Sequence, residues 1–286
     1  MSKTKPVKRL FLLAAYDAAG HVDASLVHYV RALAAHGDIV VHMDSDCTDG
    51  SIKKLGPYTL CATAARHGEY DFGSYKRAYQ YAYDAGILDQ YDFVYILNDS
   101  VYGPLMDIGP ALIDMESRGW DMFGLVYNPN RDHPHIQSWF VGMRPCAFRT
   151  KWFDTFIRGV TKLPSKGLIT RMYEHRLTAL GRENGLSIGC LYTVKNRGVY
   201  NRIKYLYRRH MPFMKKVAFS RHNGALGRQI SYVMRHIDAA TRDAILENAR
   251  RTWGDEYVAR LITSNPLRIF ARKIRYAATK ISGGKL

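Results

Sequence analysis

The chain has 286 residues, of which 47% are hydrophobic and 23% are charged. These proportions are close to those of globular proteins and argue against a fibrous repeat or a wholly disordered chain. A chain of this length buries roughly 75% of its unfolded surface, so it can form a core without disulfide or metal staples. No uninterrupted apolar stretch reaches about 18 residues, so no membrane-spanning helix is expected.

The formal net charge is +17, and it is unevenly distributed. Residues 195–221 contain nine Lys or Arg and no acid, and residues 265–286 contain six more and again no acid. Such segments attract phosphates of nucleic acid, of anionic lipid headgroups or of a diphosphate-bearing substrate, although a solvated face is the simpler alternative. The four cysteines are widely spaced, which indicates reduced thiols in a cytoplasmic protein and no zinc or redox motif.

The periodicity of the apolar residues predicts strands that alternate with helices. In chain order we expect a strand at residues 10–15, a helix at 25–35, a strand at 38–44, a turn-rich stretch at 49–57, a helix at 75–85, and strands at 93–97 and 122–126. The first run follows four cations, as in a signal peptide, but it is too short and ends at Tyr16 and Asp17.

This alternation predicts an α/β fold with a Rossmann-type, largely parallel sheet and helices on both faces. We expect one such domain at residues 1–220, followed by a basic helical extension at residues 221–286. In such sheets, ligands bind beyond the carboxyl ends of the strands.

Polar residues follow three of the predicted strands. They are Tyr16 and Asp17, then Asp44 and Asp46, then Asn98, Asp99 and Ser100. Any one such end could be an ordinary helix cap or turn. Three successive polar strand ends favour a ligand site.

A nucleoside diphosphate would suit these strand ends, because its phosphates need a cation or basic side chains and its sugar transfer needs a carboxylate base. Asp44 and Asp46 form an Asp-x-Asp string, but a three-residue pattern is weak by itself. Asp99 lacks a second acid, yet it follows a buried strand and precedes the turn at 101–104. We therefore expect Asp99 at the diphosphate and Asp44 at the nucleoside. The single carboxylate leaves metal dependence open.

The segment at 70–76 places Gly73 and Ser74 just before a predicted helix, with Lys76 in its first turn. Helix N-termini attract phosphate, so we expect Asp71, Gly73 and Lys76 near the nucleoside diphosphate of a sugar donor. The glycine spacing of a P-loop is absent. The alternative is a capped helix with a surface lysine.

The segment at 133–140 combines two histidines with aromatic and amide groups. A zinc site would need a third ligand at a useful spacing, and none stands nearby in the sequence. We therefore expect a surface for the acceptor or the donor sugar, made by His135, Gln137 and Trp139 together with Tyr102.

Residues 165–185 are predicted to form a helix closed by Gly185, with Ile169, Met172, Tyr173, Leu177 and Leu180 on one stripe. Glu174 falls at the edge of that stripe, where partial burial suits a general base. A surface glutamate paired with Arg171 or His175 is the competing interpretation.

These segments, in this order, resemble the rhamnan synthesis protein F family, glycosyltransferases of bacterial polysaccharide assembly. The resemblance extends over residues 9–220 and is carried by the segments at 15–23, 70–76, 97–104, 135–140, 173–174 and 211–215. It implies a GT-A-type nucleotide-binding sheet with Asp44 at the nucleobase, Asp99 at the diphosphate and Glu174 as the base. Asn98 departs from a full acidic pair.

The resemblance also implies deoxythymidine-diphosphate (dTDP) rhamnose as donor, with Mg²⁺ or Mn²⁺ or without a metal. The expected acceptor is a glycan or a lipid-diphosphate-linked glycan at the inner leaflet of the plasma membrane, as in O-antigen assembly, with inversion at the sugar. The basic tail, which contains Ile269, Phe270, Ile274, Tyr276 and Ile281, is expected to lie on that membrane surface.

Two other classes compete with the transferase. A nucleic-acid-binding protein would explain the charge and the 20 tyrosines, but no nucleic-acid module is recognisable, so we expect no nucleic acid as partner. A non-catalytic member of a polysaccharide complex is the other alternative.

Overall fold

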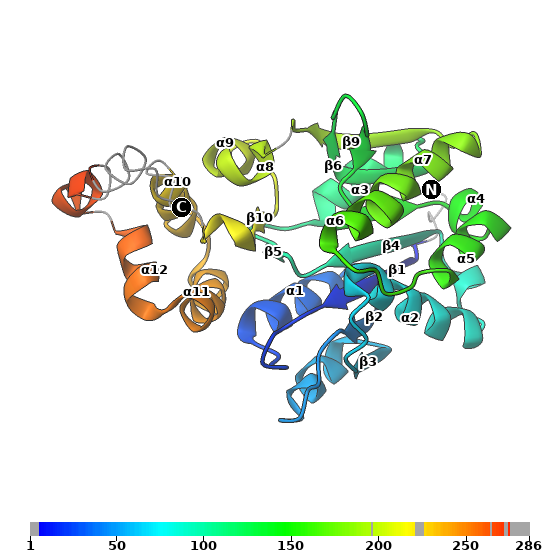
Figure 1. Ribbon diagram of the computed structural model, residues 1–286, viewed down its shortest axis with the longest axis horizontal. Coiled ribbons are helices and arrows are strands. Elements are labelled where there is room, and N and C mark those ends of the chain that lie inside the picture. Colours follow the sequence, from blue (N-terminus) through cyan, green and yellow to red (C-terminus); the bar gives the residue numbers. More distant parts are fainter. Residues whose placement is uncertain (1–5, 196, 221–225, 264, 272–273, 275–286) are drawn as a thin grey trace, which may run out of the picture. The chain divides into compact units, whose positions relative to one another are not determined.

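The computed structural model describes residues 6–195, 197–220, 226–263, 265–271 and 274 (Figure 1). The chain forms two compact units. Unit 1 comprises Met1–Val22, Val30–Asp99 and Ile108–Asn196, and unit 2 comprises Asp23–Tyr29, Ser100–Asp107 and Arg197–Leu286. Unit 2 thus combines the C-terminal helices with two short segments from the first half of the chain.

Unit 1 is built on an eight-stranded sheet of order β3-β2-β1-β4-β8-β6-β7, with β9 also paired to β6. The strands are β1 (Arg9–Ala15), β2 (Asp38–Met43), β3 (Cys61–Ala64), β4 (Phe93–Asn98), β6 (Met122–Asn128), β7 (His135–Ile136), β8 (Phe140–Met143) and β9 (Ile188–Thr193). The pairs β3–β2, β2–β1, β1–β4 and β6–β9 are parallel. The pairs β4–β8, β8–β6 and β6–β7 are antiparallel. The predicted mostly parallel sheet is confirmed.

Helices cover both faces of this sheet. The described helical segments of the unit 1 part of the chain are α1 (Ala24–Ala34, which begins in unit 2), η1 (Ser51–Tyr58), α2 (Tyr70–Asp84), η2 (Leu88–Gln90), α3 (Gly109–Ser117), α4 (Pro145–Phe148), α5 (Lys151–Arg158), α6 (Lys166–Ile169), η3 (Thr170–His175) and α7 (Arg176–Glu183). Val94 and Ile96 share a core cluster with Phe72 of α2, whereas Tyr95 bonds Glu116 of α3. Because successive strand residues face opposite sides, α2 and α3 lie on opposite faces.

The helix α2 packs against β1 and β2 and begins five residues before the predicted start (Figure 1). The sequence prediction was wrong there because Gly73 and Ser74 look like a turn before a helix. Both are buried inside the first turns of α2. A Cβ at Gly73 would lie 2.3 Å from Cβ of Glu69, so close packing explains this glycine.

Unit 2 contains a small sheet of β5 (Val101–Tyr102) and β10 (Met214–Lys215). Its described helical segments are α8 (Gly198–Asn201), α9 (Ile203–Tyr207), η4 (Lys216–Ala218), α10 (Leu226–Met234), α11 (Ala239–Trp253) and α12 (Asp255–Ile262). A buried network ties early and late segments together: the Tyr102 hydroxyl donates to Asn248 Oδ1 at 2.5 Å, and Asn248 and Arg251 both bond Asp23. Among the described residues, no helix is both long and apolar enough to cross a membrane.

A buried ion pair anchors β1 and β4 to α3. Arg9 donates to both carboxylate oxygens of Glu116, at 2.6 and 2.7 Å, and the Tyr95 hydroxyl donates to Glu116 Oε1 at 2.6 Å. Burial and the neighbouring carboxylate hold the pKa of Tyr95 well above its ordinary value.

Glu116→Ala is expected to lower the free energy of unfolding by about 3–5 kcal/mol, because it leaves the Arg9 guanidinium buried without its partner. Chemical denaturation checks this, with Asp114→Ala as the control, since Asp114 pairs with Arg118 at the surface, where an ion pair contributes at most about 1 kcal/mol. Equal losses in the two variants would contradict the account.

Candidate active site

The loops that follow β1 and β2 are bound to each other. The Asp17 backbone N–H donates to Ser45 Oγ at 3.0 Å, and that hydroxyl donates to the Asp17 carbonyl at 2.7 Å. Gly20 has φ +70°, and a Cβ there would lie 2.1 Å from the Asp46 carbonyl oxygen, so the two loops require glycine at this point. Asp17 Oδ1 accepts from the N–H groups of the same turn, while Tyr16 beside it is 51% exposed.

The carboxylate of Asp44 holds the segment between β3 and α2. Its Oδ1 accepts from the N–H groups of His67 and Gly68, at 2.8 and 3.0 Å. Burial opposes ionisation of Asp44, but these two N–H groups and the nearby Arg66 outweigh it, so the pKa of Asp44 lies below its ordinary value. Asp44 is therefore an ionised, buried carboxylate at the strand end, and its Oδ1 is occupied by hydrogen bonds to the backbone.

Two histidines with buried side chains, His42 and His67, lie close to Asp44 and to each other. The His42 and His67 rings are 5.4 Å apart, and His42 Nδ1 lies 2.8 Å from Thr63 Oγ1. Burial, followed by the proximity of His67 and Arg77, lowers the pKa of His42 from 6.5 to about 4. Burial is also the main cause of the lowered pKa of His67.

The stability of the protein is expected to fall as pH falls from about 6.5 to about 4. In that window the unfolded chain binds a proton at His42 that the folded chain does not, so protonation favours unfolding. His42→Asn should reduce the loss of denaturation midpoint between neutral pH and pH 5. His210→Asn is the control, because His210 is exposed and Asn tolerates its φ of 62°. An unchanged pH profile in His42→Asn would contradict this assignment.

The end of β4 is joined to the start of α2 by one amide. Asn98 Nδ2 donates to Asp71 Oδ2 at 2.9 Å and to the Tyr75 hydroxyl oxygen at 3.1 Å. An aspartate in place of Asn98 would set a carboxylate against Asp71 and lose both donors. Asp71 of α2 is therefore the acid that contacts Asn98 at the end of β4.

The same network reaches Glu174. The Tyr75 hydroxyl donates to the Ser138 carbonyl at 3.0 Å, and the Ser138 N–H donates to Glu174 Oε1 at 2.9 Å. Glu174 Oε2 has no hydrogen bond within the described part of the chain. One oxygen of this carboxylate is therefore fixed and the other is available, which is the arrangement that a general base needs.

Glu174 lies in a π-helical turn, η3, between α6 and α7. Such turns are rare and often occur at functional sites. The predicted stripe holds for Ile169, Tyr173 and Leu177, which are buried, but Met172 is 51% exposed. That part of the prediction was wrong because the wider π turn shifts the faces of the helix at this point.

The ring of His175, the residue after Glu174, lies close to two other histidine rings. The His175 ring lies 4.9 Å from that of His133 and 4.3 Å from that of His135. The Trp139 indole N–H donates to Gln137 Oε1 at 2.8 Å. The side chains of His135, Gln137 and Trp139 are all buried, so the structure gives them a packing position around Ser138.

Three other predicted site residues have partners or packing positions of their own. Lys76 is in the second turn of α2, where its ammonium bonds Glu69 at 3.0 Å and the Val160 carbonyl at 2.6 Å. Tyr102 is fully buried in the core of unit 2, and Ser100, also in unit 2, accepts from Lys215 at 2.9 Å. The structure thus joins Asp71, Asn98 and Glu174 through hydrogen bonds, and Asp99 follows Asn98 in the chain.

Tyr75 and Ser138 are the members of this network that sequence reasoning missed. The spacing of Asp71 and Tyr75, four residues apart, places them on one side of α2 and is a signal that the sequence does contain. Ser138 contributes only its backbone groups, so no residue pattern could have marked it.

An α/β sheet with helices on both faces and polar side chains at the carboxyl ends of its strands is an architecture that many nucleotide-binding proteins share. The chain belongs to the rhamnan synthesis protein F family, whose model matches residues 39–279. This confirms the resemblance and the enzyme class. Comparison with curated proteins gives no match.

Three solved structures illustrate what this chain is similar to. A protein assigned as a nucleotide-diphospho-sugar transferase, from Desulfovibrio desulfuricans, is 18% identical with a TM-score of 0.42, over 82% of this chain and 100% of that one. TarS from S. aureus, solved with UDP, is 12% identical with a TM-score of 0.37, over 90% and 76%. Core-mannan synthase A from Aspergillus fumigatus, in a Mn/GDP form, is 12% identical with a TM-score of 0.32, over 61% and 68%.

Proposed function

We propose that this protein transfers rhamnose from dTDP-rhamnose to a glycan or lipid-linked acceptor during assembly of a bacterial surface polysaccharide such as an O-antigen. The family supports a nucleotide-sugar donor and a polysaccharide product. The observation that carries the proposal is the hydrogen-bond chain from Asp71 through Asn98 to Glu174, because it holds a donor-side carboxylate and an available base in one network.

In the proposed reaction, Glu174 accepts the proton of an acceptor hydroxyl through Oε2. The hydroxyl oxygen forms a bond to the anomeric carbon while the bond from that carbon to the diphosphate oxygen breaks. The electron pair of the broken bond leaves with the diphosphate. Attack and departure occur on opposite faces, so the configuration at the anomeric carbon is inverted.

The donor is proposed to lie along the carboxyl ends of β1, β2 and β4. Tyr16, Asp17 and Asp44 would contact the nucleoside side, with the exposed Tyr16 ring as a surface for the base. Asp99, with Asn98 and Asp71 beside it, would contact the diphosphate and sugar side. The geometry of Lys76, Gly73 and Tyr102 gives no support to their predicted contacts, so they are not part of this proposal.

Mg²⁺ or Mn²⁺ is proposed to bind together with the donor. Among the described residues, no group of three His, Cys, Asp or Glu side chains could hold a metal ion by itself. Magnesium is commonly held by one or two carboxylates together with substrate phosphates, and Asp99 fits that arrangement. Such a cation would neutralise charge on the departing diphosphate.

We propose that the chain divides by function at residue 220: residues 1–220 carry the transferase, and the extension at residues 221–286 contacts the inner leaflet of the plasma membrane. Residues 266–271 are helical, and Leu267, Phe270 and Ile274 are 79%, 63% and 54% exposed. The i, i+3 spacing of Leu267 and Phe270 places these two side chains on one helical face, and Arg268 is the neighbour of Leu267 in the chain. An apolar face flanked by cations suits a membrane surface. Tyr276 and Ile281 of the predicted tail lie outside the described residues.

Flotation with anionic vesicles tests this contact. The double variant Leu267→Glu, Phe270→Glu is expected to stay with the soluble fraction, because each substitution adds a charge to the apolar face. Ile113→Glu is the matched control, since Ile113 is 62% exposed but lies in α3 of unit 1. Equal flotation of all three proteins would overturn the proposed membrane surface.

A transfer assay tests the proposed reaction. The full-length protein is incubated with labelled dTDP-rhamnose and an acceptor glycan, and the product is examined by NMR. Labelled acceptor with inverted anomeric configuration is the expected result. Retained configuration would overturn the mechanism, and a folded protein that transfers from no nucleotide sugar would support a non-catalytic role in a polysaccharide complex.

A further inference from the structure

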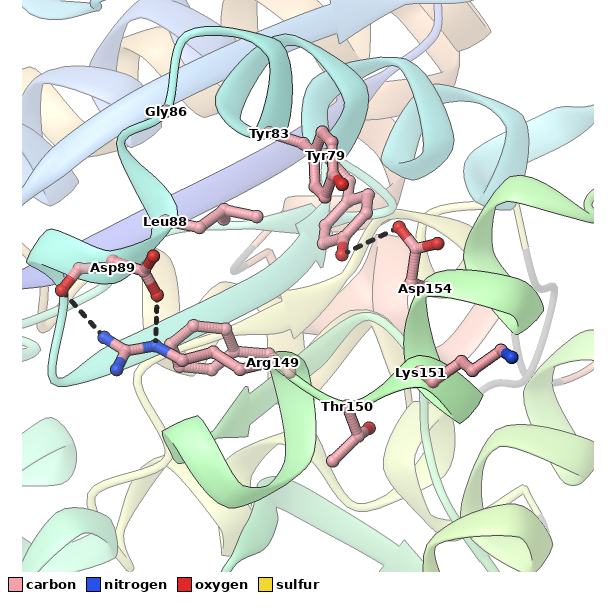
Figure 2. Close-up of a pocket in the computed structure, with 10 residues that line it drawn as sticks. Tyr79, Tyr83, Gly86, Leu88, Asp89, Arg149, Thr150, Lys151 and Asp154 are labelled. Atoms are coloured by element: carbon pink, nitrogen blue, oxygen red, sulfur yellow. Dashed lines mark hydrogen bonds and ion pairs between the residues drawn. The ribbon is translucent and has the colours of Figure 1, made fainter.

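Unit 1 has a cavity of about 620 Å³ that belongs to none of the sites described above. It is bordered by Tyr79 and Tyr83 on α2, by the turn at residues 86–89, and by residues 148–154 around the start of α5 (Figure 2). This volume lies within the range of about 300–1,000 Å³ that is typical of small-molecule sites.

Tyr79, which lines the cavity, lies one helical turn beyond Tyr75 of the strand-end network, and the cavity extends from there toward the other end of α2. Asp71 and Tyr83 are twelve residues apart on α2, which corresponds to roughly 18 Å along the helix axis. Leu88 and Asp89 precede β4, whereas Asn98 ends it, and the length of that strand gives a similar separation of roughly 17 Å. A ligand in the cavity would therefore not overlap the donor.

Two acids and two bases line the cavity: Asp89 and Asp154, and Arg149 and Lys151. Arg149 Nε lies 3.1 Å from Asp89 Oδ1, and Asp154 Oδ1 accepts from the nearby Arg158 at 2.6 Å. Each acid is thus paired with an arginine, which weakens the attraction of both arginines for a phosphate-rich ligand. A ligand that offers hydroxyl groups suits such a lining better than a polyanion does.

The lining also offers groups that bind sugar hydroxyls and sugar faces. Figure 2 shows the Tyr79 hydroxyl directed at Asp154, with an O···O distance of 3.2 Å. Asp154 Oδ2 and Lys151 Nζ have no hydrogen-bond partner within the described residues and can bond hydroxyl groups. Tyr83 is 54% exposed, and the Arg158 guanidinium lies 4.3 Å from its ring centroid. This contact fixes the ring as a flat surface for the C–H face of a sugar.

We propose that this cavity binds a distal stretch of the acceptor polysaccharide, a neutral oligosaccharide, while the growing end of the same chain occupies the strand-end site. The inference rests on the proposed function, which makes a polysaccharide the product. Two contacts on one chain raise the affinity for long acceptors without changing the affinity for short ones.

Calorimetric titration with short and long oligorhamnosides, in the absence of donor, tests the proposal on the full-length protein. Wild type should bind the long oligosaccharide more tightly than the short one. Tyr83→Ala and Lys151→Ala should each weaken binding of the long oligosaccharide by about tenfold and leave the short one unchanged. Tyr81→Ala is the matched control, because Tyr81 is 38% exposed on the same helix but does not line the cavity.

Wild-type binding that is independent of length would overturn the proposal, as would equal effects of Tyr83→Ala and Tyr81→Ala. Thermal unfolding of each variant verifies that it is folded. The thermal shift caused by the donor, measured in the same proteins, separates the two proposals. If the donor does not stabilise wild type, the proposed transferase is contradicted. If the donor stabilises wild type but binding does not depend on oligosaccharide length, only the cavity proposal is contradicted.

Discussion

Glu174→Gln is expected to lower the turnover number by about 10²–10⁴-fold while donor affinity stays unchanged, because a positioned base contributes that much to a proton transfer. The substitution keeps the shape of the side chain, so Oε1 can still accept from the Ser138 N–H. It removes only the ability to take a proton. Steady-state kinetics with saturating donor and acceptor measure the turnover number.

Glu183→Gln is the control for Glu174→Gln. Glu183 ends α7, the helix that follows η3, and it pairs with Arg176 at the surface. Turnover in this variant should equal that of wild type. If Glu174→Gln retained full turnover, or if it lost donor binding, the assignment of Glu174 as the base would be wrong.

Asp99→Asn is expected to weaken donor binding by roughly 10- to 100-fold, the equivalent of a contact that involves a charged group. The amide preserves the volume of the side chain, which is only 9% exposed, and removes its charge. If Asp99 binds a cation together with the diphosphate, the donor affinity of the variant should be the same with Mg²⁺ as with a chelator.

Titration with a nucleoside diphosphate measures this effect, and Asp84→Asn is the control because Asp84 is an exposed residue at the end of α2. Equal donor affinity in Asp99→Asn and wild type would remove Asp99 from the site.

The buried strands could be predicted because they are continuous apolar runs, which is how strands covered on both faces appear in a sequence. Residues 10–15, 38–44, 93–97 and 122–126 all coincide with strands of the sheet. The carboxyl ends of these strands in turn predict Asp44, Asn98 and Asp99 as candidate site residues. The role of Glu174 as the base is predicted by the family resemblance.

The contacts between these segments could not be predicted, because they depend on residues far apart in the chain. Asn98 is 27 positions from Asp71, and Val160, which accepts from Lys76, is 84 positions away. Lys76 looked available for phosphate because its partners are not visible in the sequence. The π turn at Glu174 is likewise invisible to a periodicity that assumes α-helical turns.

The central claim, a nucleotide-sugar site at the carboxyl ends of β1, β2 and β4, is tested most directly by thermal unfolding with a panel of nucleoside diphosphates and nucleotide sugars, each with and without Mg²⁺ or Mn²⁺. A ligand at 100 times its dissociation constant stabilises a protein by about 2.7 kcal/mol, so a donor should raise the melting temperature by about 5 °C or more. We expect this shift with dTDP-rhamnose in wild type and a shift of about half that size or less in Asp99→Asn at the same ligand concentration. An unchanged melting temperature with every nucleotide and nucleotide sugar would contradict the account.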